Sequence, residues 1–146
     1  ANVTSIFNDQ LGFLTTAEPL ARRAIALVQN VGPGTEKFYF GELYPLLLGR
    51  PYPGRDDFLR TVTLLHSLGI YANVQIIGYH FDQPFADLAE AVDFWKEQMR
   101  LTEPEQERRL VGFLQGKLQR VGDRLLAPMR RQSAVIWWRV SPKDQP

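Results

Sequence analysis

The sequence predicts an α/β fold in which helices alternate with about four main strands. Hydrophobic patterns along the 146 residues follow the order strand, helix, strand, helix, strand, two helices, strand. The segments between the strands are long enough for the helical crossovers that parallel strands require. The composition, with 45% hydrophobic residues, is sufficient for one core of ordinary size. We therefore expect residues 1–140 to form a single domain with a mostly parallel sheet, followed by a flexible tail at 141–146.

The first expected element is a short strand. Residues 3–7 alternate in polarity and are partly β-branched, which is typical of a strand. Asn8 and Asp9 follow as turn-forming residues, so we expect this strand to end in a polar loop.

A helix and a second strand are expected next. Thr15 and Glu18 have the spacing of a capping box, and apolar residues at helical spacing then predict a helix that runs to about Asn30. The Gly-Pro-Gly at 32–34 is expected to end this helix. The aromatic run KFYFG at 37–41 predicts a short strand inside the sheet.

The middle of the chain is expected to hold a connector, a capped helix and a long strand. Residues 42–54 are rich in proline and glycine, which indicates a connector. Asp56 or Asp57 is expected to cap a helix that Gly69 ends, because the apolar residues between them follow a helical period. Residues 70–81 predict a strand that is buried on both faces.

Two helices, an extended segment and a last strand complete the prediction. Apolar residues at helical spacing predict a helical insertion over 85–121, whose second helix begins at Thr102. Residues 124–129 are expected to be extended. The segment SAVIWWRV at 133–140 predicts the last strand.

The composition excludes several classes of function. Seventeen Lys and Arg balance sixteen Asp and Glu, so the net charge of +1 provides no general attraction for nucleic acid or anionic membranes. The absence of cysteine excludes disulfides, thiolate metal sites and cysteine nucleophiles, and we expect no metal site. No apolar run approaches the ~20 residues that span a bilayer, and no signal-peptide pattern opens the chain. We therefore expect a cytoplasmic protein.

Charge is unevenly distributed within the C-terminal part. Residues 82–107 are mainly acidic, whereas residues 108–139 contain eight bases and the single acid Asp123. This basic stretch has two interpretations: a face for RNA or an acidic partner, or a complement to the acidic helix. The second is favoured because no stacking aromatics are interleaved with the arginines, so nucleic acid is not expected as a partner.

In an open α/β sheet, ligands usually lie beyond the carboxyl ends of the strands. Four polar residues that follow expected strands are therefore the candidate site residues: Asn8, Asp9, Glu42 and Tyr44. Asn8 and Asp9 have a simpler interpretation as turn formers. Glu42 and Tyr44 lie in a connector that is longer than a minimal crossover, and such loops are often functional.

Familiar catalytic and nucleotide-binding motifs are absent from the sequence. It contains no G-x-x-x-x-G-K-[ST] loop, no G-x-S-x-G elbow, no H-E-x-x-H and no G-x-G-x-x-G. The Gly-Pro-Gly at 32–34 is expected between a helix and a strand, which is the wrong order for an anion held at a helix N-terminus. His66 and His80 have no partner that the sequence identifies. No catalytic residue is therefore assigned.

Taken in order, these elements resemble the C-terminal half of class I S-adenosylmethionine-dependent methyltransferases. The segments that carry the resemblance include ARRAIALV, HSLGI, YANVQIIGYHF, FADLAEAVDFWKEQMRL and RRQSAVIWWRV, within residues 3–140. The order of elements carries it more than any invariant motif does. The resemblance implies a partial Rossmann-like methyltransferase sheet of about four main strands, the last one antiparallel, with flanking helices and a two-helix insertion.

The resemblance also implies a place for each strand and each candidate residue. Four segments would match the fourth to seventh strands of the family's seven-stranded sheet, in this order: 3–7, 37–41, 70–81 and 133–140. Asn8 and Asp9 would then lie where the fourth strand meets the methyl donor and acceptor. Residues 42–44 would line the acceptor side, and the helical insertion would shape the acceptor pocket or a subunit contact.

The cofactor half of the family has no counterpart in this sequence. The glycine-rich loop and the acidic residue that binds the ribose are both missing. The resemblance therefore implies an acceptor-side C-terminal fragment of a methyltransferase. S-adenosylmethionine would be the cofactor of a full-length parent that acts on a small-molecule acceptor, and this chain alone is expected neither to bind it nor to be active.

A second class of function stays open from the sequence. The alternative interpretation is a non-enzymatic interaction module, complete as it is. Such a module would form a homodimer through an exposed strand edge or through the helices at 85–121.

Overall fold

The computed structural model describes residues 9–35 and 37–140. The expected strand at 3–7 and the expected tail at 141–146 lie outside these residues, as does Asn8. The sheets and helices described below show a mixed α/β protein.

The described residues belong to two compact units, and each has a hydrophobic core of its own. Unit 1 comprises the described residues within Ala1–Pro33, Arg55–Gly78 and Gln132–Pro146. Unit 2 comprises those within Gly34–Gly54 and Tyr79–Arg131.

The first helix of unit 1, α1 (Gln10–Leu20), begins earlier than the sequence predicts. The Asp9 carboxylate caps it by accepting a hydrogen bond of 2.8 Å from the Gly12 N–H. The Thr15 hydroxyl donates to the Gly12 carbonyl instead of opening a new helix. The predicted helix is present in its first part, but it ends at Leu20, so its predicted extension to about Asn30 is wrong.

The segment that follows α1 is a strand, β1 (Ala24–Asn30). Ile25, Leu27 and Gln29 are buried, whereas the residues between them are exposed or half-buried. This period of two is that of a strand with one covered face. The spacing of apolar residues in this segment fits both a helix and a strand. Pairing with another strand decides in favour of the strand.

The second helix of unit 1, α3 (Asp57–Ser67), confirms the prediction from its capping residues. The Asp56 carboxylate accepts a hydrogen bond of 2.9 Å from the Leu59 N–H. Gly69 follows the helix with a φ of +75°, in the left-handed region that favours glycine.

The sheet of unit 1 has the strand order β1-β6-β2, with β6 (Arg130–Arg139) in the middle and β2 (Asn73–His80) at an edge. β1 pairs with β6 in antiparallel register along its whole length. The two predicted strands at 70–81 and 133–140 are thus both present, with slightly different bounds.

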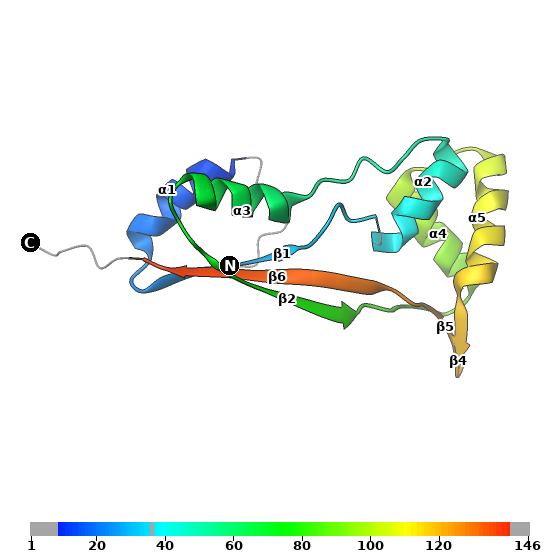
Figure 1. The fold of residues 1–146 in the computed structure, drawn as a ribbon. Helices are drawn as coiled ribbons and strands as arrows, with labels where there is room; N and C mark the ends of the chain where they lie inside the picture. Colours follow the sequence, from blue (N-terminus) through cyan, green and yellow to red (C-terminus); the bar gives the residue numbers. More distant parts are fainter. Residues whose placement is uncertain (1–8, 36, 141–146) are drawn as a thin grey trace, which may run out of the picture. The chain divides into compact units, whose positions relative to one another are not determined.

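β2 also runs antiparallel to β6, as the opposed arrows in Figure 1 show. Near one end, the Asn73 side-chain amide donates to the Trp137 carbonyl at 3.4 Å. Near the other, the Phe81 N–H donates to the Met129 carbonyl at 2.8 Å. β1 and β2 consequently run in the same direction, as the crossover through α3 predicts, but β6 lies between them. The predicted mostly parallel sheet is therefore wrong, because no neighbouring strands among the described residues are parallel.

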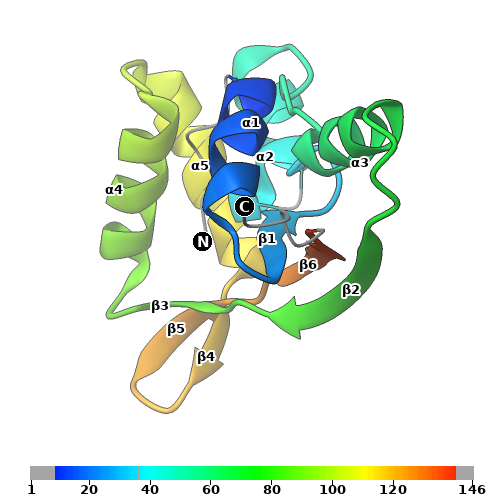
Figure 2. The same cartoon turned by 90° about the vertical axis from the view of Figure 1, so that its left-hand side faces the viewer.

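One face of this sheet is covered by helices. Figures 1 and 2 show α1 and α3 on the same side of the three strands. The core between helices and sheet contains buried residues from four elements: Leu14, Ile25, Leu27, Leu65, Ala134, Ile136 and Trp138.

The edge strand β2 is exposed along its whole length. Val74, Ile76 and Ile77 are 41%, 50% and 45% exposed. The prediction of a strand buried on both faces is therefore wrong, because β2 lies at the edge of the sheet and neither of its faces is covered by the described residues.

Unit 2 combines helices with a small antiparallel sheet. Its elements are η1 (Lys37–Tyr39, a 3₁₀ turn), α2 (Phe40–Leu48), β3 (Gln83–Phe85), α4 (Leu88–Met99), α5 (Pro104–Lys117), β4 (Gln119–Val121) and β5 (Arg124–Ala127). The sheet has the order β3-β5-β4, and both of its pairings are antiparallel. α5 packs against both α2 and α4.

The predicted strand at 37–41 and the predicted connector at 42–54 are wrong in this unit. Residues 37–41 form η1 and the first turn of α2, which occupies most of the expected connector. Phe40 is 7% exposed and packs into a helical core. Aromatic residues are common in strands because they bury large surfaces, and a helix that buries the same surface satisfies that preference equally.

The helical insertion at 85–121 is present but shorter than predicted. Its second helix, α5, is opened by a capping box between Glu103 and Gln106, not by Thr102. It ends at Lys117, and the next residues form a hairpin that turns at Gly122, where φ is +61°. The last residues of the predicted insertion are thus a strand and not a helix. The extended segment predicted at 124–129 is confirmed as β5.

The core of unit 2 is rich in aromatic residues. Trp95, Leu43, Leu110 and Leu114 are fully buried. The rings of Phe85 and Phe94 lie 5.3 Å and 5.1 Å from that of Trp95. Among the described residues, no helix is both long and apolar enough to cross a membrane.

Candidate functional site

A hollow of about 340 Å³ in unit 2 lies between the start of α2 and the segment that precedes β6. Its lining contains one carboxylate, one guanidinium, one phenol and one aliphatic hydroxyl. The lining residues are Thr35, Tyr39, Gly41, Glu42, Pro128, Met129 and Arg130.

The backbone that carries the phenol is strained. Phe38 and Tyr39 have φ values of +51° and +57°, in the left-handed region that bulky residues rarely adopt. The buried Trp95 donates its indole N–H to the Phe38 carbonyl at 2.8 Å. The Tyr39 hydroxyl donates to the Pro128 carbonyl at 2.9 Å, and the Tyr39 ring stacks on Trp95. Strain of this kind persists where surrounding contacts over-determine it, and it clusters at functional sites.

A close backbone approach shapes the floor of the hollow. The Gly41 N–H donates to the Thr35 carbonyl at 2.7 Å. A Cβ atom at position 41 would lie 3.0 Å from the Thr35 Cβ and 3.2 Å from its carbonyl oxygen. Glycine at this position therefore keeps the start of α2 against Thr35.

Burial, with the neighbouring Asp82 and Glu42 carboxylates, raises the pKa of Tyr39 to about 12. The Tyr39 phenol is therefore neutral at physiological pH, which keeps its O–H available to donate the hydrogen bond to the Pro128 carbonyl. Glu42 pairs with Lys117 at 2.8 Å on the exposed side. The Asp82 carboxylate accepts from the Met129 N–H at 3.0 Å.

This arrangement is suited to holding a small polar molecule by hydrogen bonds and charge. Glu42 and the Thr35 hydroxyl supply acceptors, and the exposed Arg130 supplies donors. No group of His, Cys, Asp or Glu side chains within the described ranges 9–35 and 37–140 is arranged to bind a metal ion.

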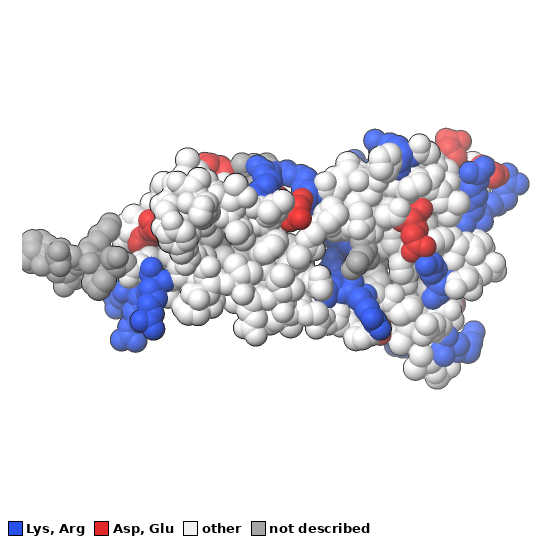
Figure 3. Space-filling view, viewed as in Figure 1, with Lys and Arg blue, Asp and Glu red and all other residues white. Residues whose placement is uncertain are grey.

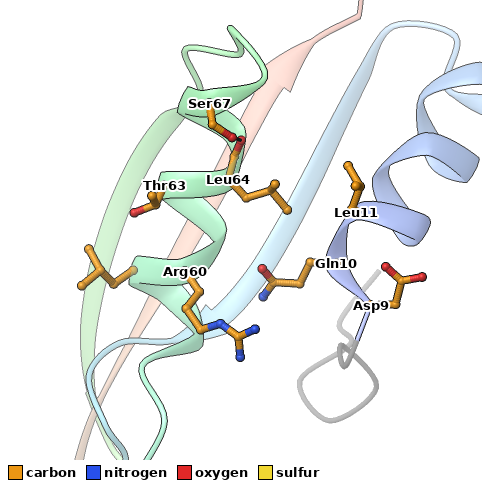
Figure 4. Close-up of a pocket in the computed structure, with 8 residues that line it drawn as sticks. Asp9, Gln10, Leu11, Arg60, Thr63, Leu64 and Ser67 are labelled. Atoms are coloured by element: carbon orange, nitrogen blue, oxygen red, sulfur yellow. Dashed lines mark hydrogen bonds between the residues drawn. The ribbon is translucent and has the colours of Figure 1, made fainter.

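A second cavity, of about 630 Å³, lies in unit 1 between α1 and α3 (Figure 4). Gln10 reaches from α1 toward α3, where its amide donates to the Thr61 hydroxyl at 2.9 Å. Arg60 lies on the α3 side and Asp9 at the start of α1. Its remaining lining is Leu11, Leu59, Thr63, Leu64 and Ser67.

Asp9 has a structural role in this cavity. One of its carboxylate oxygens is the acceptor that caps α1. A Cβ atom at position 12 would lie 2.1 Å from the other oxygen, so glycine at position 12 leaves room for the cap. This geometry agrees with the simpler interpretation of Asp9 as a turn and capping residue.

Three of the four sequence-predicted site residues are described, and each has different surroundings. Asn8 lies outside the described residues. Asp9 lines the cavity of unit 1, and Glu42 lines the hollow of unit 2. Tyr44 does not line that hollow; its ring packs against Phe40 and Tyr52. Their assignment to an active site stays a prediction.

Sequence reasoning missed the residues that share the hollow with Glu42. Thr35 and Tyr39 lie before the expected connector, and Arg130 lies before the expected last strand. The one available signal is the dense aromatic run before Glu42, which marks a segment that packs into a core. The left-handed conformation that directs Tyr39 to Pro128 has no sequence signature, because the residues that adopt it are not glycine or asparagine.

Basic side chains stand in separate groups on the face shown in Figure 3, with acidic side chains between several of them. Arg108 and Arg109 both pair with Glu105 on α5, and Lys96 pairs with Glu107 at 2.6 Å. Glu105, Arg108 and Arg109 lie on one helix, and Lys96 and Glu107 both lie within residues 82–107, so these pairs do not test whether an acidic and a basic helix complement each other.

Comparison with known proteins yields a distant structural likeness. No family model matches the chain, and no curated protein matches it significantly. Among solved structures, one that it resembles is a "putative methyltransferase" from Bacillus halodurans C-125, with 17% identity and a TM-score of 0.32. The match covers 80% of this chain and 55% of the other, so the chain spans about half the length of that protein.

Proposed function

We propose that this chain is the acceptor-side portion of an S-adenosylmethionine-dependent methyltransferase. In this proposal, unit 1 is the C-terminal end of the methyltransferase sheet and unit 2 is an inserted module that contacts the methyl acceptor. S-adenosylmethionine is the cofactor of the full-length parent, and the acceptor is a small molecule.

The strand order β1-β6-β2 is the observation that carries the proposal. The resemblance in sequence implies a sheet whose closing strand is antiparallel. β6 is the last strand in the chain. It lies between β1 and β2, which run parallel to each other, and it is antiparallel to both. A chain that merely alternated strands and helices would place successive parallel strands side by side.

The structure changes one assignment within the proposal. Residues 37–41 are helical and do not supply the fifth strand of the family's sheet. β1 precedes α3 and β2 in the chain, so we assign the fifth strand to Ala24–Asn30, the sixth to β2 and the seventh to β6. α3 is then the crossover between the fifth and sixth strands.

Unit 2 then consists of two insertions. One follows β1 and contains η1 and α2; the other lies between β2 and β6 and contains α4 and α5. Both contribute to the hollow around Tyr39, which we propose as a contact surface for the acceptor. Positioning of donor and acceptor is the main source of catalysis that such a module would provide.

The uncovered edge of the unit 1 sheet also supports the proposal. β2 exposes Val74, Ile76 and Ile77, and Trp137 of β6 is 39% exposed. Soluble proteins usually cover or pair an exposed apolar edge strand of this kind. Further protein that packs against this sheet would bury these side chains.

Cofactor titration tests the proposal. Isothermal calorimetry with S-adenosylmethionine would compare this chain with the product of the complete reading frame that encodes it. We expect binding only to the longer product, with a glycine-rich turn after its first strand. A complete reading frame that adds no such segment, or a longer product that does not bind the cofactor, would refute the proposal.

The exposed β2 favours a second candidate function, an interaction module that forms a homodimer through this strand. Sedimentation at several concentrations of this chain, with Ile76→Lys as the comparison, tests it. A dimer that Ile76→Lys dissociates supports the second candidate. A wild-type monomer at all concentrations excludes it.

A further inference from the structure

Two cationic side chains each lie within about 6 Å of the same aromatic ring in unit 2. The Lys37 Nζ lies 5.3 Å from the centroid of the Phe38 ring, and the Arg131 Cζ lies 6.0 Å from the same centroid. Arg131 also lies over the Phe81 ring, with its Cζ at 5.0 Å from the centroid. These four side chains, Lys37, Phe38, Phe81 and Arg131, are called the cation–aromatic cluster below.

The two cations of this cluster have no acidic partner among the residues that the structure describes. Neither Lys37 nor Arg131 takes part in an ion pair or a side-chain hydrogen bond there. Burial, and then the charge of Arg131, lower the pKa of Lys37. The charge of Arg131 disfavours the charged form of Lys37, and a bound anion would offset this effect.

Two carboxylates of unit 2 have other partners. Asp82 accepts a hydrogen bond from the Met129 N–H, and Glu42 pairs with Lys117. In contrast to these paired groups, Arg131 has its Cζ 5.0 Å from the centroid of the Phe81 ring. The guanidinium carries five N–H donors, and contact with an aromatic ring leaves donors available to a planar acceptor.

The rings define the rest of the ligand. Phe81 is 42% exposed, so part of the aromatic surface beside Arg131 is open to solvent. An aromatic body can pack on this surface while its carboxylate meets the two cations. A phenyl carboxylate therefore satisfies the charge and the apolar surface together.

We propose that the cation–aromatic cluster is a binding site for an aromatic carboxylate. The carboxylate is held by Lys37 and Arg131, and the aromatic body packs beside Phe38 and Phe81. This inference goes beyond methyl transfer, because the cluster does not line the hollow around Tyr39 and its binding can be measured without any cofactor.

A titration followed by ¹H–¹⁵N NMR of the full chain tests the proposal. The probes are sodium benzoate, its neutral analogue benzamide, and sodium acetate at constant ionic strength. We expect benzoate to shift the signals of residues 37–38, 81 and 131 in a saturable way. Benzamide and acetate are each expected to bind at least about tenfold more weakly, because each lacks one half of the recognition. Equal binding of benzamide or acetate would overturn the proposal, and so would saturable shifts elsewhere only.

Substitutions distinguish benzoate binding at the cluster from a general attraction of the anion to positive charge. Lys37→Met and Arg131→Gln are each expected to weaken benzoate binding by about tenfold or more. Arg120→Gln/Arg124→Gln is the control, since it removes charge from exposed positions of the same unit. Benzoate affinity that falls equally in the control would overturn the site. The comparison of benzoate with benzamide uses wild-type protein, so it decides the question even if a variant fails to fold.

Discussion

The hydrogen bond from Trp95 to the Phe38 carbonyl gives a direct test of what holds the strained segment in unit 2. Trp95→Phe removes the donor, which lies 2.8 Å from that carbonyl in a fully buried position. A buried acceptor left without a partner costs about 1–3 kcal/mol. The smaller ring adds a packing loss on the order of 1 kcal/mol. We therefore expect the free energy of unfolding to fall by about 2–4 kcal/mol.

Urea denaturation followed by far-ultraviolet circular dichroism measures this change. With a denaturant slope of about 2 kcal/mol per molar urea, the midpoint should fall by about 1–2 M. Phe85→Leu is the matched control: Phe85 contacts the same indole, is 4% exposed and provides no hydrogen bond through its side chain. It is expected to cost roughly 1–1.5 kcal/mol. If Trp95→Phe costs no more than Phe85→Leu, the hydrogen bond does not stabilise the segment and the reasoning is wrong.

Three further predictions concern glycine, a cap and a phenol. Gly112→Ala should stabilise the protein by about 0.5–1 kcal/mol, because a Cβ at this position of α5 meets open space. Gly69→Ala should destabilise it by about 1–2 kcal/mol, because φ at position 69 is +75°. Urea titrations of both variants measure these changes. Asp56→Ala should cost about 1 kcal/mol by the same assay, because α3 loses the acceptor for the Leu59 N–H. Tyr39 should ionise at a pKa of about 12 in an absorbance titration, and Tyr39→Phe should remove that step. Because the unfolded phenol ionises near pH 10, the stability that Tyr39 contributes is complete below pH 10 and is lost as the pH rises to about 12. If the absorbance change near pH 12 is the same in Tyr39→Phe as in the wild type, this assignment is refuted.

Local chemistry explains which elements could be predicted from the sequence. α3 is correct because Asp56 and Gly69 act within one turn of the helix ends, and no distant contact is needed to place them. β6 is correct because the run from 133 to 140 is rich in β-branched and aromatic residues.

The remaining errors arise where distant contacts decide the structure. The spacing of apolar residues in Ala24–Asn30 satisfies a helix and a strand, and pairing with β6 makes it a strand. Residues 37–41 have the aromatic composition of a strand. However, Trp95, which is distant in sequence, holds the Phe38 carbonyl by a hydrogen bond within a helical core. The position of β6 between β1 and β2 also depends on all three strands at once.

The candidate site follows the same division. Glu42 could be selected because polar residues beyond an apolar run often face ligands, and it does line a hollow. Tyr44 could not be excluded by that rule, since residues 42 and 44 of a helix point in different directions. Tyr39 could not be found, because its orientation depends on an uncommon backbone conformation.

The exposed β2 also affects how this protein behaves when it is heated. Residues 74–79, VQIIGY, contain no charge and no proline, and they form an edge strand. Such segments pair with identical segments of other chains and assemble into cross-β aggregates. Thermal unfolding is therefore expected to be irreversible, with an apparent Tm that depends on scan rate and protein concentration. A lysine at position 76 should slow this aggregation while the cores of both units stay intact.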